Sequence, residues 1–588
     1  MTEYHRHPLI RTAGYLVLIL ALTLLQACIA GRVHGDQKTQ QSLGLDFLLS
    51  NEPLKSPQPT YVFMPPEHHN APANRLEGLL TLIPGSGSSQ IEILTDTFGI
   101  AADETLRLKE LPPYSFSFVM DGADIIPLER EPQTTNHPNW EIIAEPGIAW
   151  DLSGESGWSH AALPFTLKEK NENCLHNGLM TFLYKDDGSI TRVAWQVVSE
   201  TCLYVKINLW GVINSRYEPG SIASAEEVIT AYRTEVANRL PVKPLSDIRE
   251  DYPDLEPAGF YPPGLDDASV YGFVMNGINY RSECPTRFGP YPFCDVLDLP
   301  SYSLAKSVFG GLGYFILTKR WPEFETTPVI ELIPECDLED GRWSGVTPAH
   351  LLNMTTGNYE STLFNADEDA ASMVTFFEAE THPGKVRFSC EAWPRKSEPG
   401  TQWAYHTTDT YLLGIAMNRF LKQKLGQQYD IYADIVYPEV FKPLGLSPVS
   451  RWTHRTYDDA SQPFTGYGLV FHHDDVVRIA QALNSDSALS KHLAGANFES
   501  AMFRSSNPRY TGLDPNDLAY SNGFWGVNVS QSITCPETTW VPFFSGYGGI
   551  AVAMFPNGSI YYYFTDSNKH GFRTASIEAN NALNFCKE

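Results

Sequence analysis

The cysteines constrain the fold of this chain more than any other feature. There are nine of them in 588 residues, and an odd count in an exported chain leaves one cysteine that needs its own explanation. Cys28 supplies one, because it follows a basic-leaning lead and a short apolar run over residues 14–25. A run of ~12 apolar residues is too short to cross a bilayer as a helix but is typical of a secretory signal.

The segment Leu25-Gln26-Ala27-Cys28 resembles a bacterial lipobox, in which the cysteine is acylated and becomes the first mature residue. The residue after it is Ile29 rather than Asp, which favours the outer over the inner membrane. An ordinary secretory signal cut near Ala30 is the alternative. We therefore expect a signal peptide over residues 1–27 and a lipid-anchored protein of the bacterial cell envelope, in the outer membrane.

The remaining eight cysteines are even in number, and an export route permits their oxidation. Sequence alone does not give their connectivity. We expect sequential pairs, because each neighbouring pair falls inside one proposed domain. No C-x-x-C motif or Cys/His cluster with zinc spacing is present, so we expect disulfides and no metal. The eight are Cys174, Cys202, Cys284, Cys294, Cys336, Cys390, Cys535 and Cys586.

Patterns along the chain indicate an α+β protein of several parts. Residues 28–70 are rich in Gln, Pro, Asn and Ser and predict a tether. Short apolar runs separated by turns predict a β-rich, sandwich-like domain over 71–215. A helical and proline-rich connector over 216–265 follows, and 266–588 mix helix and strand signals. Hydrophobic residues make up 43% of the chain, which excludes a mainly disordered protein, and a net charge of -27 argues against nucleic-acid binding.

The mixed region contains Ser303-Leu304-Ala305-Lys306, an S-x-x-K motif. An apolar face over 308–316 predicts that Ser303 lies at the beginning of a helix, with Lys306 on the same face nearly one turn later. Burial favours the neutral amine of lysine, which can then take the serine proton and activate the hydroxyl as a nucleophile. The four letters alone occur often by chance, so the motif needs further support.

Two later elements give that support. One is Pro399-Gly400-Thr401-Gln402-Trp403-Ala404-Tyr405-His406-Thr407, and the other is Phe544-Ser545-Gly546-Tyr547-Gly548-Gly549 before an apolar strand. With the S-x-x-K motif, their order resembles the serine β-lactamase-like hydrolases: class C β-lactamases, D-Ala-D-Ala peptidases and related esterases and amide hydrolases. The resemblance covers the chain from about Ala268 to its end.

The resemblance implies a β-lactamase-like fold and no cofactor. It implies Ser303 as nucleophile, Lys306 as its activating partner and Tyr405 as a proton shuttle, held as phenolate by Lys306. It also places the backbone N–H groups of Ser303 and Tyr547 in an oxyanion hole. Ser545, Gly546 and Thr407 complete the expected substrate site.

Two departures from the family pattern bear on the substrate. Thr407 stands where class C enzymes carry Asn, and Phe544 stands where a Lys or His helps to hold a substrate carboxylate. We therefore expect an exported serine hydrolase acting on a small-molecule or peptide-like ester or amide, with an unassigned partner for the β-rich domain. Two alternatives stay open: a degenerate binding or scaffolding lipoprotein, and a true D-Ala-D-Ala peptidase or β-lactamase.

Two further clusters have simpler interpretations. His472-His473-Asp474-Asp475 precedes a helical apolar stripe, so the aspartates are expected to cap that helix rather than to bind metal. Asp367-Glu368-Asp369 is interpreted as an exposed acidic loop.

Overall fold

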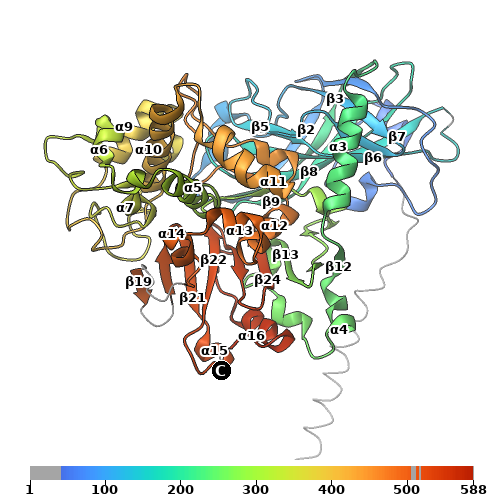
Figure 1. The fold of residues 1–588 in the computed structure, drawn as a ribbon. Coiled ribbons are helices and arrows are strands. Elements are labelled where there is room, and N and C mark those ends of the chain that lie inside the picture. Colours follow the sequence, from blue (N-terminus) through green and yellow to red (C-terminus); the bar gives the residue numbers. More distant parts are fainter. Residues whose placement is uncertain (1–41, 156, 505–510, 515–517, 587–588) are drawn as a thin grey trace, which may run out of the picture.

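The computed structural model describes residues 42–155, 157–504, 511–514 and 518–586 (Figure 1). The predicted signal peptide and Cys28 therefore lie outside the described residues. Within them no helix is both long and apolar enough to span a bilayer.

Eleven strands form one antiparallel sheet in the N-terminal part. They are β1 (Gly78–Leu82), β2 (Ser88–Asp96), β3 (Tyr114–Asp121), β4 (Asp124–Pro127), β5 (Trp140–Ala144), β6 (Gly147–Trp150), β7 (Ser159–Glu169), β8 (Leu175–Tyr184), β9 (Val193–Thr201), β10 (Val205–Ile213) and β11 (Ser215–Pro219). The predicted β-rich character of the N-terminal region is confirmed.

The N-terminal sheet curls back on itself instead of splitting into two sheets. Its order is β11-β1-β3-β4-β6-β7-β8-β9-β10-β2, with β5 paired to β7. Only Asn214 separates β10 from β11, so the two ends of this path meet along one nearly continuous strand. The enclosed core is rich in aromatic side chains, including Phe165, Trp140 and Trp195. A curled single sheet encloses its core without a second layer, which accounts for the difference from a sandwich.

The tether predicted over residues 28–70 is shorter than expected. Residues 42–64 include α2 (Leu45–Leu49) and belong to the folded body, because Leu48, Leu54 and Phe63 among them are buried. Leu48 and Leu54 pack on the outside of the N-terminal sheet, and Phe63 joins the main core of the C-terminal half. The indole N–H of Trp210 donates to the carbonyl of Leu54 over 3.0 Å.

The connector joins both halves. Helix α3 (Ala225–Asn238) buries Ile229 against the N-terminal sheet, while β12 (Val242–Pro244) adds a parallel strand to the C-terminal sheet beside β14 (Ile278–Arg281). The short helix α4 (Ile248–Asp251) follows β12 in the chain.

The C-terminal sheet has nine strands in the order β12-β14-β13-β24-β23-β22-β21-β20-β19. The remaining strands are β13 (Ala268–Met275), β19 (Thr511–Asp514), β20 (Leu518–Ser521), β21 (Phe524–Asn528), β22 (Trp540–Gly546), β23 (Ile550–Met554) and β24 (Ile560–Thr565). Both faces are covered: Tyr562 and Phe564 of β24 join one core, and Tyr561 and Tyr563 join the other. The aromatic run 561–564 is thus a buried strand, as its composition predicts.

Most helices gather on one side of this sheet (Figure 1). They are α5 (Leu312–Arg320), α6 (Val329–Leu332), α7 (Pro348–Leu352), α8 (Met373–Glu378), α9 (His382–Glu391), α10 (Thr407–Leu425), α11 (Lys442–Leu444), α12 (His473–Leu483), α13 (Ala488–Leu493) and α14 (Ala496–Ala501). Helix α15 (Ser530–Ile533) contacts α16 (Arg573–Ala582), which packs on the other face. The C-terminal half is therefore a mixed α+β arrangement of one antiparallel-dominated sheet with helices on its faces.

All four predicted disulfides form in sequential order: Cys174–Cys202, Cys284–Cys294, Cys336–Cys390 and Cys535–Cys586. The first ties two loops of the N-terminal sheet together, and the last fastens the end of the chain to the segment before β22. Each such bridge adds about 2–4 kcal/mol of stability by restricting the unfolded chain.

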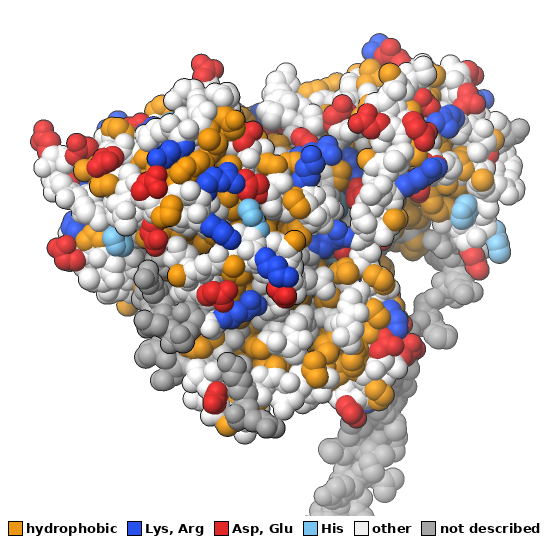
Figure 2. All heavy atoms as spheres, viewed as in Figure 1, with side chains coloured by type: hydrophobic (Ala, Val, Ile, Leu, Met, Phe, Trp, Pro, Cys, Tyr) orange, Lys and Arg blue, Asp and Glu red, His pale blue; other side chains and the backbone are white. Residues whose placement is uncertain are grey.

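On the face drawn in Figure 2, Lys and Arg side chains lie in small groups among acidic and uncharged ones.

Candidate active site

Ser303 lies where a short strand passes into a helix. The strand β17 (Leu299–Pro300) pairs with β18 (Val470–Phe471), and a π-helical segment, Lys306–Gly311, leads into α5. Between them Tyr302 adopts the left-handed conformation, with φ of 40°, which is uncommon for a residue other than glycine. Ser303 stays half-exposed while Leu304 and Ala305 are buried. The turn therefore presents one hydroxyl at the surface of the core.

Lys306 makes three polar contacts from a buried position. Its Nζ atom lies 2.8 Å from Ser303 Oγ, 2.8 Å from Thr407 Oγ1 and 3.1 Å from the carbonyl oxygen of Gly466. Burial lowers the pKa of Lys306 to about 8, against the opposing effect of the Glu368 charge. In the neutral amine, two N–H groups serve Thr407 and Gly466, and the lone pair is left to accept the proton of Ser303.

Tyr405 lies beside this pair, two residues before α10 begins at Thr407. Its side chain is buried, and the Nζ atom of Lys306 lies 4.9 Å from the centroid of its ring. Burial raises the pKa of Tyr405 well above 10, and a hydrogen bond with Ser303 opposes this only in part. A raised pKa favours the neutral phenol of Tyr405 over the expected phenolate.

Thr407 connects Lys306 to a carboxylate that the sequence did not single out. Its hydroxyl accepts a hydrogen bond from Lys306 and donates one to Glu368, and its backbone N–H donates to Glu368 Oε2 over 2.8 Å. This gives a continuous chain from Ser303 through Lys306 and Thr407 to Glu368. In a continuous chain of this kind, neighbouring hydrogen bonds polarise and strengthen one another.

The interpretation of residues 367–369 as an exposed acidic loop is wrong for two of the three. Asp367 is 4% exposed and accepts a hydrogen bond from His406 over 3.0 Å, Glu368 is half-buried, and only Asp369 is exposed. Burial alone would lower the pKa of His406, but Asp409 and Asp367 outweigh it and raise the pKa to about 9. The sequence does not indicate a role for Glu368, because a loop with three acidic residues has the same composition whether it is exposed or packs against the active site.

The end of β22 lies against the nucleophile segment. A Cβ atom on Gly546 would lie 3.0 Å from the carbonyl oxygen of Ser301 and 3.0 Å from Leu304 Cδ1, so any larger residue here requires these neighbours to shift by a few tenths of an ångström. The Ser545 hydroxyl donates to the carbonyl oxygen of Ile550 over 2.9 Å. Phe544 points the other way and is fully buried in the core. The strand therefore places Gly546 and its neighbours at Ser303 and offers no cation at position 544.

The expected oxyanion hole consists of two backbone N–H groups. Neither that of Ser303 nor that of Tyr547 donates to another group of the described residues. Tyr547 follows Gly546 directly, and its ring meets that of Tyr302 edge-on with centroids 5.7 Å apart. Two unpaired N–H groups on facing segments are what a developing oxyanion requires.

His472 and Asp475 cap α12 together. The Asp475 side chain accepts from the backbone N–H of His472 over 2.9 Å, and the backbone N–H of Asp475 bonds the His472 ring in return. The remaining ring nitrogen, Nε2, faces Glu145 at 3.4 Å and Asp298 at 3.5 Å. The two carboxylates outweigh the effect of burial and raise the pKa of His472 to about 10. The ligand atoms of Glu145, Asp298 and His472 lie within 4.8 Å of one another, so these three buried side chains also have the spacing of possible metal ligands.

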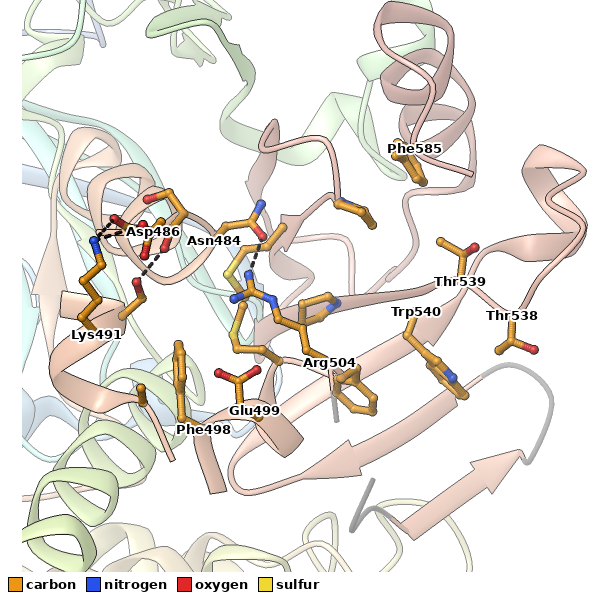
Figure 3. A pocket seen from close by; sticks show the side chains of 18 residues that line it. Asn484, Asp486, Lys491, Phe498, Glu499, Arg504, Thr538, Thr539, Trp540 and Phe585 are labelled. Atoms are coloured by element: carbon orange, nitrogen blue, oxygen red, sulfur yellow. Dashed lines mark hydrogen bonds and ion pairs between the residues drawn. The ribbon is translucent and has the colours of Figure 1, made fainter. Parts of the chain in front are cut away.

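A cavity of about 990 Å³ opens at the opposite end of β22 from Gly546. Figure 3 shows Asn484, Lys491, Arg504 and Trp540 around it. Trp540 begins the seven-residue strand β22, which at ~3.4 Å per residue separates this cavity from Gly546 by roughly 20 Å. The cavity is therefore distinct from the site around Ser303.

Comparisons with known proteins relate part of the chain to a family. Residues 302–560 match the family model described as Beta-lactamase. A search of curated proteins finds no match. Solved structures that resemble the chain include a putative 6-aminohexanoate-dimer hydrolase from Bacillus anthracis, with 15% identity over 58% of this chain and 81% of that one and a TM-score of 0.40.

Two others are EstCE1, a hydrolase with promiscuous acyltransferase activity, and a class C β-lactamase in complex with cefoxitin. EstCE1 is 13% identical, with 60% of this chain and 99% of that one covered and a TM-score of 0.41. The β-lactamase is 13% identical, with 60% and 98% covered and a TM-score of 0.37. The matched family suggests a serine hydrolase. Residues 302–560 of this chain are a domain of the serine β-lactamase-like family.

Proposed function

We propose that this protein is an exported, lipid-anchored serine hydrolase that cleaves an ester or an amide through an acyl-enzyme on Ser303. The observation that carries the proposal is the position of Lys306. Its Nζ atom lies 2.8 Å from Ser303 Oγ, and its two other contacts occupy both N–H groups of the neutral amine. An amine arranged in this way is a general base for the serine hydroxyl.

Acylation begins when neutral Lys306 accepts the proton of Ser303. The Oγ atom attacks the carbonyl carbon of the substrate, and the carbonyl oxygen becomes an oxyanion that accepts from the N–H groups of Ser303 and Tyr547. The lysinium ion that forms is stabilised by Thr407 and, through it, by Glu368. This negative charge raises the pKa of Lys306 and so favours the proton transfer.

Release of the leaving group needs a proton donor near Ser303. The phenol of Tyr405 belongs to a ring whose centroid lies 4.9 Å from Lys306 Nζ, and its raised pKa favours the protonated form. We assign Tyr405 the donation of a proton to the leaving oxygen or nitrogen, after which it regains one from Lys306. Water then attacks the acyl carbon, with the same groups acting in reverse, and Ser303 is restored. At the end of the cycle Lys306 is again a neutral amine and Tyr405 a neutral phenol, so both can act on the next substrate.

Position 544 bears on the class of substrate. In β-lactamases and D-Ala-D-Ala peptidases a Lys or His there helps to hold the substrate carboxylate, but Phe544 is buried and faces the core. We therefore favour an ester or amide without a carboxylate at that point. The intact contacts among Ser303, Lys306 and Tyr405 speak against a purely binding protein.

The export and the lipid anchor rest on the sequence. Cys28 ends a lipobox-like segment, and the four disulfides suit an oxidising compartment outside the cytoplasm. Metabolic labelling with an azide-tagged fatty acid tests this. Label that enters the wild-type chain and is lost in Cys28→Ala supports the anchor, and equal labelling of both contradicts it.

Activity is tested with a panel of uncharged esters and amides and a chromogenic cephalosporin. We expect turnover of at least one uncharged ester or amide that Ser303→Ala abolishes. Turnover of the cephalosporin alone would favour a β-lactamase, and no turnover of any substrate by wild type and variant alike would favour the binding protein.

A further inference from the structure

Asn173 belongs to the N-terminal sheet but reaches into the active-site region. It lies in the loop between β7 and β8 and precedes Cys174, whose disulfide to Cys202 joins this loop to the one between β9 and β10. Its side chain is 0% exposed. A fully buried amide must be hydrogen-bonded to avoid a large desolvation penalty, so its partners show where it acts.

All the partners of this side chain lie in the C-terminal half. Asn173 Oδ1 accepts from the backbone N–H of Tyr302 over 2.8 Å, from the N–H of Gly468 over 3.0 Å and from the Ser301 hydroxyl over 3.2 Å. Its Nδ2 donates to the carbonyl oxygen of Leu469 over 3.3 Å. Two backbone N–H donors fix which atom of the amide is the oxygen.

These contacts hold the residue immediately before the nucleophile. Tyr302 has a φ of 40°, a left-handed conformation that L-residues rarely adopt unless their surroundings impose it. Asn173 fixes its backbone N–H, and its phenol lies 3.4 Å from both Cys174 Sγ and the carbonyl oxygen of Thr201. The turn that presents Ser303 is thus held at both ends of Tyr302 by the N-terminal sheet.

We propose that Asn173 is a positioning residue for Ser303, so that the N-terminal domain is a structural part of the active site rather than a separate module. The inference rests on the proposed hydrolase function. Displacing the reacting atom by about 1 Å can cost about 10²-fold in rate, which makes the turn at Tyr302 a sensitive point.

The chain offers a matched control in Asn208. This residue also belongs to the N-terminal sheet and also bonds across the boundary, since its Oδ1 accepts from Arg287 Nε over 2.9 Å. It has no bond to residues 301–303. Asn208→Ala therefore removes a comparable contact between the two halves and leaves the nucleophile turn intact.

The experiment compares full-length wild type, Asn173→Ala, Asn173→Asp and Asn208→Ala. For each, the thermal midpoint, kcat and KM on an ester that the wild type cleaves, and the rate of Ser303 labelling by a fluorophosphonate are measured against pH. We expect Asn173→Ala to lower kcat and labelling by about 10- to 100-fold with KM nearly unchanged. Asn208→Ala should stay within about 3-fold of wild type.

Asn173→Asp keeps the accepting oxygen and adds a buried negative charge. It should react faster than Asn173→Ala, and its rate should rise only at higher pH, because a nearby anion raises the pKa of Lys306. If Asn173→Ala does not fold, an unshifted pH profile in Asn173→Asp overturns the inference. Wild-type rates in folded Asn173→Ala, or equal losses in Asn208→Ala, also overturn it. A wild type that is neither labelled nor active would instead contradict the proposed function.

Discussion

The Nζ atom of Lys306 lies 2.8 Å from the Oγ atom of Ser303, and no more than 3.1 Å from two further oxygens, of Thr407 and Gly466. Three partners around one nitrogen leave a single geometry for the neutral amine, with its lone pair toward the serine. In this arrangement Ser303 can act as the nucleophile and Lys306 as its general base. The protonation state of Lys306 then determines how the activity depends on pH.

The acylation rate should rise with pH and then level off. Only neutral Lys306 can accept the serine proton, and burial lowers its pKa to about 8. Below that pH the amine is protonated and the rate falls about tenfold per unit; above it the rate reaches a plateau. Initial rates on a neutral ester from pH 5 to 10 give the profile. A flat profile over this range would contradict the role of Lys306.

Glu368→Gln should move that profile to lower pH. The Glu368 carboxylate raises the pKa of Lys306, so its removal lets the amine lose its proton at a lower pH. The plateau rate should fall, because the lysinium formed during acylation loses a stabilising charge. Asp369→Asn, a change at the exposed neighbour, is the control and should leave the profile near that of wild type. An unchanged profile in Glu368→Gln would mean that the chain through Thr407 has no electrostatic role.

Gly546→Val should abolish activity while the protein still folds. Even a Cβ atom at this position would lie 3.0 Å from Ser301 O and from Leu304 Cδ1, so the strand end and the nucleophile turn must separate. Overpacking of this kind costs about 1–3 kcal/mol, and loss of an oxyanion donor costs about 10²–10³ in rate. Thermal unfolding and fluorophosphonate labelling measured together separate the two effects. Wild-type labelling would show that the approach of β22 is unnecessary.

Phe544→Lys should destabilise the protein without creating a carboxylate-binding site. Phe544 is fully buried and meets the ring of Phe524 edge-on, so a lysine there would place an unpaired charge in the core. Phe544→Leu, which keeps the position apolar, should have a much smaller effect on the thermal midpoint. A stable Phe544→Lys variant that gains cephalosporin hydrolysis would contradict this assignment of the strand.

Much of the fold could be predicted because local rules agree with the tertiary structure. Asn276 and Gly277, a pair typical of a type I′ hairpin turn, both adopt positive φ between β13 and β14. Thr347 and Pro348 begin α7, as an N-cap threonine and a first-turn proline ordinarily do. In contrast β7 lacks the alternation that marks a half-exposed strand, because all its side chains are buried. It also contains a proline, Pro164, which ordinarily argues against a central strand.

The active site could be predicted only where its residues lie in motifs. Ser303, Lys306, Tyr405 and Thr407 have characteristic neighbours, and the structure brings them together. Glu368 and Asn173 have none, because their role depends on where their loops fold: one from before α8, the other from a different domain. Contacts between segments so far apart in the chain leave no local pattern.

The most direct test of the central claim is mass spectrometry of the intact chain after reaction with a fluorophosphonate, followed by peptide mapping. The account predicts one adduct per chain, on the peptide that contains Ser303, faster above pH 8 than below it and absent from Ser303→Ala and strongly slowed in Lys306→Ala. An adduct on another residue, or equal labelling of Ser303→Ala, would contradict it.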